Sequence, residues 1–150
     1  MKRIVLGADH GGYELKNTIK SHLVSLGYDV TDVGTNAPDS CDYPIYANHL
    51  SQKIQEGTAD LGILVCGTGI GMSMAANKHK GIRAACCSDT FSARLTRLHN
   101  NANVLCLGAR VLGTGLALDL VDEFITAEFE GDRHVKRLSL VEDIENGKNL

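Results

Sequence analysis

Short apolar runs alternate with amphipathic segments along the whole chain. The runs are rich in Val, Ile and Leu and lack strict polar alternation, which is typical of strands buried on both faces. Five of them are predicted to be strands: Arg3–Ala8, Tyr28–Val33, Leu61–Val65, Ile82–Cys87 and Val104–Leu107. Because helical patterns separate these runs, we expect an α/β fold with a parallel sheet and right-handed crossovers.

Apolar side chains at helical spacing mark three of the connecting helices. Their stripes are Leu15, Ile19, Leu23 and Leu26, then Ala47, Leu50 and Ile54, then Leu116, Leu120, Val121 and Phe124. The first two helices are expected to end at Gly27 and Gly57. Residues Val135–Asn146 predict a helix beyond the sheet, a candidate arm onto a neighbouring subunit. The loop Gly34–Tyr43 is the longest irregular stretch and is expected to form a lid or rim.

The predicted architecture is a single-domain, Rossmann-like three-layer sandwich over residues 1–150. A five-stranded parallel sheet carries helices on both faces, and a C-terminal helix is added to it. In such sheets ligands bind at the carboxyl ends of the strands. The residues that directly follow strands are therefore candidates for the site: Asp9 and His10, Cys66–Gly71, Ser88 and Asp89, and Gly108–Arg110.

Composition narrows the classes of function. The formal charge of −3 argues against a general nucleic-acid binder. No apolar run approaches the roughly 18–20 residues that span a bilayer, so no membrane partner is expected. Six of the seven arginines follow residue 80, and arginine is well suited to binding phosphate. A small phosphorylated ligand is therefore favoured over a polyanion.

Cysteine usage indicates a reducing compartment. The five cysteines are odd in number and form no Cys-x-x-Cys pair, which favours reduced thiols over disulfides or a zinc site. Met1-Lys2-Arg3 runs straight into the first strand without a signal peptide, so a cytoplasmic protein is expected. No His, Cys and carboxylate cluster has the spacing of metal ligands, and neither a metal nor a cofactor is predicted.

The segment Cys66-Gly67-Thr68-Gly69-Ile70-Gly71 carries the clearest chemical signal. An apolar strand ends in a thiol, and a loop with three glycines then opens a helix. Glycines let main-chain N–H groups approach an anion, and a helix start adds partial positive charge. A base or nucleophile beside such an oxyanion cradle indicates catalysis, because anion binding alone would not require sulfur. Asp9-His10-Gly11-Gly12 forms a second glycine-bearing turn at the same edge.

Each of these features also has a structural interpretation. The glycine run is also compatible with a tight turn, or with part of a dinucleotide fingerprint in which Asp89 would bind ribose. Asp9 is a candidate helix cap and His99-Asn100 a helix end. Arg133 and Arg137, spaced i, i+4, also suit a solvated basic surface. The other strand thiols are expected to be buried structural groups: Cys86, Cys87 and Cys106.

Helix direction separates His99 from Cys66. A crossover helix runs from the carboxyl edge of the sheet back to its amino edge, and eleven helical residues span about 16 Å. His99 ends such a helix, so it is expected to lie far from its own Cys66. If His99 is catalytic, it serves the site of another subunit.

Taken together, the motifs closely resemble the type B ribose-5-phosphate isomerases, a family that includes relatives acting on six-carbon sugar phosphates. The matching motifs are Asp9-His10-Gly11-Gly12, Asp42-Tyr43-Pro44, Cys66–Gly71, His99-Asn100, Gly108-x-Arg110 and Arg133-His134-x-x-Arg137. The resemblance covers nearly the whole chain. It implies interconversion of ribose 5-phosphate and ribulose 5-phosphate, without a metal, by a homodimer with shared sites that some members pair into tetramers.

The resemblance also implies roles for single residues. Cys66 would be the base that moves a proton between C1 and C2, and His99 the acid that opens the furanose ring. Asp9 would bind the sugar hydroxyls and assist ring opening, and Thr68, also counted as catalytic, and Asn100 would make further contacts to the sugar. The amides from Gly67 through Thr68, Gly69 and Ile70 to Gly71 would hold the enediolate, and the phosphate would lie among His10, Arg110, Arg133 and Arg137.

Two other functions remain open at this point. One is a hexose-6-phosphate isomerase, for allose or galactose phosphates, with the same chemistry. The other is a non-catalytic nucleotide-binding module that uses Gly67–Gly71 and Asp89.

Overall fold

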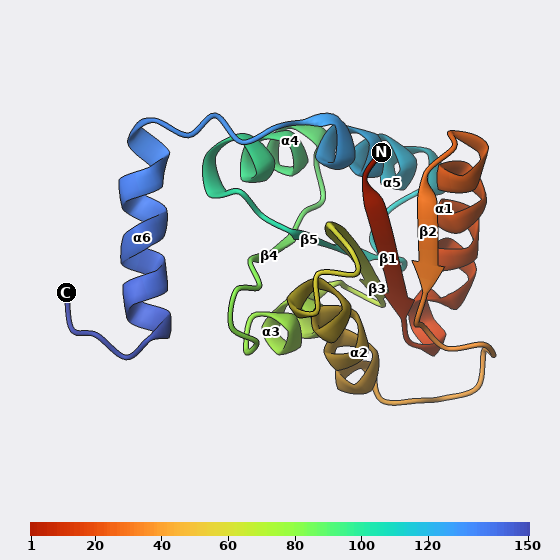
Figure 1. The fold of residues 1–150 in the computed structure, drawn as a ribbon. Helices are drawn as coiled ribbons and strands as arrows, with labels where there is room; N and C mark the ends of the chain where they lie inside the picture. Colours follow the sequence, from red (N-terminus) through yellow and green to blue (C-terminus); the bar gives the residue numbers. More distant parts are fainter.

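The computed structural model describes residues 1–150 and contains a five-stranded, all-parallel sheet in the order β2-β1-β3-β5-β4 (Figure 1). The strands are β1 Arg3–Ala8, β2 Asp29–Asp32, β3 Leu61–Cys66, β4 Ala84–Cys86 and β5 Val104–Gly108. The helices are α1 Tyr13–Ser25, α2 Tyr43–Gln55, α3 Ile70–Ala76, α4 Thr90–Asn100, α5 Thr114–Thr126 and α6 Arg133–Glu145, with a short 3-10 turn, η1, at His10–Gly12. None of the helices is long and apolar enough to cross a lipid bilayer.

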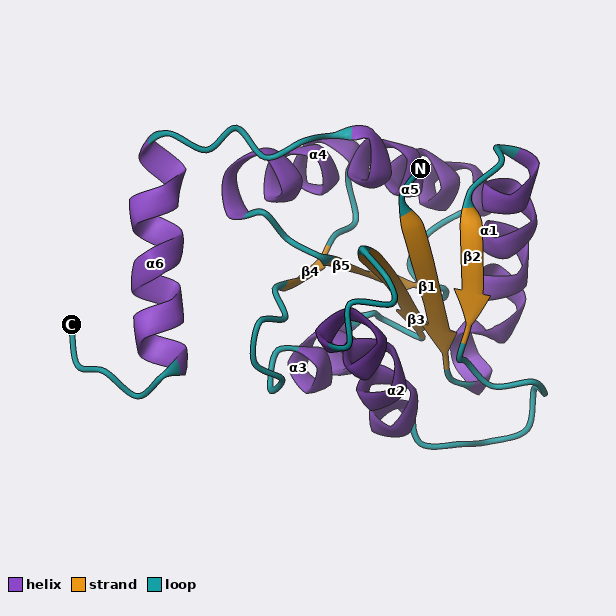
Figure 2. Cartoon of the chain, in the orientation of Figure 1, coloured by secondary structure: helices purple, strands orange, loops and turns teal.

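Helices cover both faces of the sheet, as predicted (Figure 2). The larger core lies between the sheet and helices α1, α4 and α5, and the smaller one between the sheet and helices α2 and α3. Strand residues alternate between the two cores: in β3, Ile63 and Val65 face the larger core, whereas Leu64 and Cys66 face the smaller. The three-layer architecture is confirmed, and Cys66 lies on the α2/α3 side.

Three details differ from the expectations. The strands β2 and β4 are shorter than predicted because they are the sheet edges, where each pairs with a single neighbour. Cys86 is exposed on the edge strand β4, unlike the buried Cys87 and Cys106, so its assignment as a buried thiol was wrong. In α5, Leu116 is also exposed, and Ala117 faces the core in its place.

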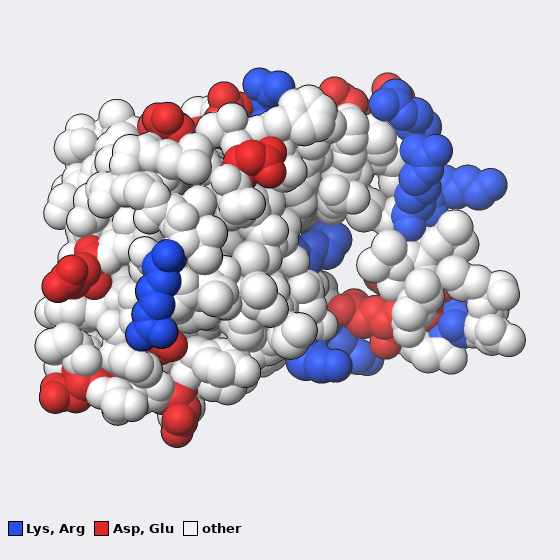
Figure 3. All heavy atoms as spheres, turned by 180° about the vertical axis from the view of Figure 1, so that it is seen from behind, with Lys and Arg blue, Asp and Glu red and all other residues white.

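The helix α6 stands apart from the sheet and packs against the end of α4, and its Glu145 accepts hydrogen bonds from the Gly81 amide (Figure 1). Figure 3 shows the opening between α6 and the rest of the molecule, with basic side chains over the first half of the helix. Two hollows of about 340 and 510 Å³ lie in this opening. The α6 residues Val135, Val141 and Ile144 line them and are more than half exposed. An exposed apolar helix face of this kind marks an interaction surface.

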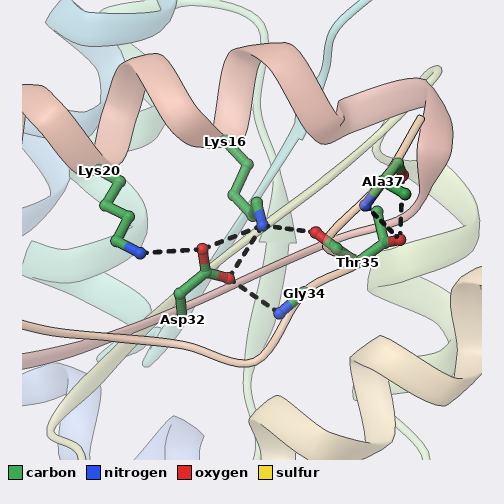
Figure 4. Close-up of polar contacts among 6 residues, drawn as sticks. All are labelled: Lys16, Lys20, Asp32, Gly34, Thr35 and Ala37. Carbon is green, nitrogen blue, oxygen red and sulfur yellow. Dashed lines mark hydrogen bonds and ion pairs between the residues drawn. The ribbon is translucent and has the colours of Figure 1, made fainter.

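A buried lysine anchors the loop between β2 and α2 (Figure 4). Lys16 is 1% exposed, and its Nζ donates to both carboxylate oxygens of Asp32 at 3.0 Å and to the carbonyl oxygen of Thr35 at 2.8 Å. The Gly34 amide donates to Asp32 as well, at 3.0 Å, and Lys20 reaches the same carboxylate from the surface at 3.4 Å. Partial burial opposes the charged form of Asp32, but the hydrogen bonds from Lys16 and Gly34 hold the pKa of this carboxyl below its ordinary value.

Replacing Lys16 by methionine is expected to lower the free energy of unfolding at neutral pH by about 3 kcal/mol, because it leaves a largely buried carboxylate without its main partner. Denaturant titration measures this loss. Because the native pKa of Asp32 lies below its unfolded value of about 3.9, the pair stabilises the fold above that pH. This stabilisation disappears as the pH falls through the native pKa, so the difference between variant and wild type should shrink in acid.

The matched control is Lys20→Met, which removes an exposed cation from the same carboxylate and should cost less than about 1 kcal/mol. Equal losses for the two variants, or a Lys16→Met deficit that does not change with pH, would contradict this account of the buried pair.

Candidate active site

The candidate site lies where the chain leaves the two central strands, β1 and β3. These strands are neighbours, and the chain continues from them toward opposite edges of the sheet, which makes the crevice at their carboxyl ends a topological switch point. The turn after β1 carries Asp9 and His10, and the segment Cys66–Gly71 runs from the last residue of β3 through a short loop into the start of α3. The Asp9 amide donates to the Val65 carbonyl at 3.3 Å and joins the two segments.

Glycines permit this close approach. A Cβ atom on Gly12 would lie 2.4 Å from the Val65 carbonyl oxygen, and one on Gly11 would lie 3.3 Å from the Gly67 amide nitrogen. Gly69 has a φ of 77°, in the left-handed region that glycine adopts without strain, and caps the start of α3. The glycines that the sequence singled out therefore shape the loop that follows the thiol.

Cys66 is largely buried, with 5% of its surface exposed, and its Sγ accepts a hydrogen bond from the Gly69 amide at 3.1 Å. The amides of Gly67, Thr68 and Gly71 donate to no main-chain carbonyl. Sulfur and unpaired N–H groups thus share one short loop. This arrangement can place a base beside donors for an oxyanion.

Two more residues of the predicted site lie on this loop. The Oγ1 of the exposed Thr68 accepts a hydrogen bond from the amide of the half-exposed Ile70 at 3.3 Å. The ring of Tyr43, from the start of α2, lies over Gly71, where a Cβ atom would be 2.7 Å from Tyr43 Cζ. Tyr43 therefore covers the outer side of the loop.

Asp9 is buried and caps the turn η1, where its Oδ1 accepts from the Gly12 amide at 3.1 Å. The capping interpretation is thus confirmed. Capping uses one carboxylate oxygen, and the other keeps its capacity to accept a hydrogen bond from a ligand hydroxyl.

His10 and Arg110 line one hollow of about 420 Å³ beside the loop. The His10 Nδ1 accepts a hydrogen bond from the Cys41 amide at 3.2 Å, so the neutral ring carries its proton on Nε2. The Arg110 amide donates to the Gly67 carbonyl at 3.0 Å, which holds this arginine next to the glycine loop. Two side chains able to donate hydrogen bonds to an anion therefore converge on the same hollow.

The remaining predicted residues lie at the opposite edge of the sheet. Helix α4 begins after β4 and returns before β5, so His99 and Asn100 lie at the amino edge, whereas Cys66 pairs with Gly108 at the far end of β5. This strand has five residues, a length of about 16 Å. Arg133 and Arg137 project from α6, which packs against the end of α4. Within one chain, therefore, these four residues (His99, Asn100, Arg133 and Arg137) do not lie next to Cys66.

His99 has two neighbours that the sequence did not single out for a role. Its ring stacks on that of His134 with centroids 4.3 Å apart, and its Nε2 lies 3.7 Å from a carboxylate oxygen of Glu130. Burial, together with the positive charge of Arg133, lowers the pKa of His134. In the sequence, His134 was noted only as a member of the motif Arg133-His134-x-x-Arg137, without a role of its own. Glu130 was not noted at all, because the turn that brings it next to His134 cannot be read from the spacing of the two residues.

The structure also bears on the nucleotide alternative. The Oδ1 of Asp89 accepts from the Ser92 amide at 2.7 Å and caps α4, so this oxygen is already engaged. The strand β5 lies between the strands that carry Asp89 and the glycine loop. In a dinucleotide fingerprint the acidic residue lies close enough to bind the same nucleotide as the loop. This arrangement argues against the nucleotide-binding module.

Comparison with known proteins identifies the family. The model of the family described as "Ribose/Galactose Isomerase" matches residues 4–141. The ribose-5-phosphate isomerase B of Escherichia coli K12 is 47% identical over 99% of this chain and 100% of its own length. The structure of the Clostridium thermocellum ribose-5-phosphate isomerase B has a TM-score of 0.96 at 48% identity, covering 97% of this chain and 98% of that one.

A second structure carries a ligand. The ribose-5-phosphate isomerase B of Mycoplasma genitalium, with bound ribulose-5-phosphate, has a TM-score of 0.93 at 41% identity and covers 97% of both chains. Fold and sequence thus agree along almost the entire length. This chain therefore belongs to the ribose/galactose isomerase family.

Proposed function

We propose that residues 1–150 act as one sugar-phosphate isomerase domain that interconverts ribose 5-phosphate and ribulose 5-phosphate. The observation that carries this proposal is the Cys66 sulfur, held in a glycine loop whose amides at Gly67, Thr68 and Gly71 have no main-chain acceptor. An aldose–ketose isomerase needs both a base and an oxyanion site. The full-length similarity to enzymes named for this activity supports the same substrate.

In the proposed mechanism Cys66, as the thiolate, takes the proton from C2 of the open-chain aldose. The C–H electrons form the C1–C2 double bond, and the carbonyl electrons move to O1, which the free loop amides stabilise. The same sulfur returns the proton to C1, while the hydroxyl proton passes from O2 to O1, giving the ketose. Asp9 and Thr68 contact the sugar hydroxyls.

Ring opening requires an acid, and His99 is the candidate. It lies at the opposite edge of the sheet from its own Cys66. We therefore infer a homodimer in which His99 of the partner subunit and Asn100 of the partner subunit complete each site. The exposed apolar residues of α6 support a partner on this side of the molecule. Some relatives that the motifs resemble pair such dimers into tetramers, and this chain is a candidate for the same assembly.

The phosphate is proposed to lie beside His10 and Arg110, which share one hollow. Arg133 and Arg137 would approach it from α6 of the partner, on the same side as His99. Phosphate binding far from the reacting carbons supplies energy that holds the sugar in register. No metal or cofactor takes part in these steps.

A coupled assay with ribose 5-phosphate tests this function directly. Turnover of ribose 5-phosphate should exceed turnover of allose 6-phosphate and galactose 6-phosphate at equal enzyme concentration. Faster turnover of either hexose phosphate would favour the six-carbon alternative. Calorimetry with NAD and AMP completes the test, because tight nucleotide binding without isomerisation would reject the enzyme assignment.

A further inference from the structure

Three potential metal ligands lie together beside helix α4, outside the loop that carries Cys66. The nitrogens of His99 and His134 and a carboxylate oxygen of Glu130 all lie within 4.8 Å of one another. The Glu130 Oε2 is 3.7 Å from His99 Nε2 and 3.5 Å from His134 Nε2. Two imidazoles and one carboxylate form a common ligand set for Zn²⁺.

One nitrogen of this cluster, the His134 Nε2, has no hydrogen-bond partner. The side chain of His134 is 8% exposed, and this nitrogen is buried. A buried polar atom with no partner carries a free-energy cost that a bound ligand would remove. The unpaired nitrogen lies next to Glu130 and His99, where such a ligand would bind.

The backbone holds these groups in place. The Glu130 amide donates to the Leu98 carbonyl at 3.0 Å, one residue before His99, and the His134 amide donates to the Gly131 carbonyl at 3.0 Å. The connection between Glu130 and His134 turns sharply, with positive φ at Gly131 and Asp132. The cluster is therefore built on a helix end and a fixed turn.

The two separations from Glu130 are close to those of a zinc site. With Zn–N and Zn–O distances of about 2.0–2.1 Å, tetrahedral ligand atoms lie about 3.4 Å apart. The two distances to Glu130 exceed this value by only a few tenths of an ångström. The stacked rings are nearly parallel, at 15°, so one must turn for both lone pairs to converge. His99, whose side chain is 32% exposed, has the room to do so.

We propose that His99, Glu130 and His134 bind a divalent transition metal such as Zn²⁺, and that the bound metal inhibits isomerisation. Inhibition rests on the proposed function, since the metal occupies the His99 nitrogen that would donate the proton for ring opening. Binding itself does not depend on that function. Solvent or the partner subunit would complete the coordination.

Calorimetry with Zn²⁺ alone, on the full-length protein, tests the binding. We expect one metal per chain in the wild type and loss of that binding in both His134→Gln and Glu130→Gln. His22→Gln is the matched control, because His22 pairs with a single carboxylate, Asp122, elsewhere on the surface. It should bind as the wild type does. Circular dichroism verifies that each variant is folded.

Co²⁺ absorption identifies the ligands independently of activity. Visible bands without a near-ultraviolet thiolate band would support the His and Glu ligands. A thiolate band, or stoichiometric binding that persists in both variants, would overturn the site.

Inhibition is then measured as a fraction of each protein's own activity. Zn²⁺ at site-filling concentration should inhibit the wild type and spare His134→Gln. Equal inhibition of the two would reject the regulatory role. If neither the wild type nor the variants isomerise ribose 5-phosphate, the proposed function fails. The calorimetry still shows whether the metal binds at His99, Glu130 and His134.

Discussion

Replacement of Cys66 by alanine is expected to lower kcat for ribose 5-phosphate by about 10²–10⁴-fold, the usual contribution of a positioned base. Substrate binding should change little, because the proposed phosphate contacts at His10 and Arg110 lie on other segments and the loop amides remain. Steady-state kinetics give kcat, and calorimetry on the inactive variant gives the dissociation constant directly.

The main alternative is that the sulfur only shapes the loop, since it accepts the Gly69 amide at 3.1 Å. Cys66→Ser separates the two roles. A hydroxyl can accept the same hydrogen bond, but it is a far weaker acid than a thiol and cannot supply the anionic base. We therefore expect the serine variant to be nearly as inactive as the alanine variant. A serine variant with near wild-type kcat would show that the sulfur has a structural role only.

A second thiol beside the same loop provides the matched control. The Sγ of Cys86 donates to the Thr68 carbonyl at 3.6 Å, and although the residue as a whole is exposed, partial burial raises the pKa of its thiol. A raised pKa disfavours the thiolate, so Cys86 is a poor base despite its position. Cys86→Ala should keep most of the activity. Comparable losses in the Cys66 and Cys86 variants would point to loop packing rather than to proton transfer.

The sequence predicted the parts of this fold that depend on local pattern. Buried strands such as β1 and β3 have continuous apolar runs, and Gly27 and Gly57 end their helices with φ of 85° and 71°. The half of the site after β1 and β3 was predictable for the same reason, because parallel strands bring their carboxyl ends to one edge.

Features that depend on long-range contacts were not predictable from pattern. Lys16 looks like a surface residue in the sequence, yet it is buried, with its charge paired to Asp32 and a hydrogen bond to the Thr35 carbonyl. The cluster of His99 with Glu130 joins groups 31 residues apart in the chain, so no spacing rule finds it. The lengths of β2 and β4 were overestimated because apolar composition does not reveal which strands are edges.

The topology of the sheet explains why the predicted site residues lie in two separate groups, one at each edge of the sheet. Every crossover helix starts at the carboxyl edge and ends at the amino edge, so residues at a helix end cannot reach a loop at a strand end of the same chain. His99, at the end of the crossover helix α4, therefore lies away from Cys66, and Arg137 lies on α6, which packs against the end of α4. A site that needs both groups requires a second copy of the chain, and two-fold symmetry would then produce two equal sites.

Dimers formed from two different variants test whether Cys66 and His99 of one site come from different subunits. Cys66→Ala and His99→Ala should each be inactive alone, because each removes one group from both sites of its homodimer. In a hybrid, one site carries both substitutions and the other carries neither. Random exchange makes half of the dimers hybrid, each with one intact site, so about a quarter of the wild-type activity should return.

The control is a mixture of Cys66→Ala with Cys66→Ser, in which no site regains the base and no activity should appear. Native mass spectrometry of the two mixtures measures the hybrid fraction. If hybrids form at the expected fraction and activity stays absent, Cys66 and His99 do not meet across a subunit boundary. The ring-opening acid would then have to come from the same edge as Cys66, where Asp9 is the nearest carboxylate that follows a strand.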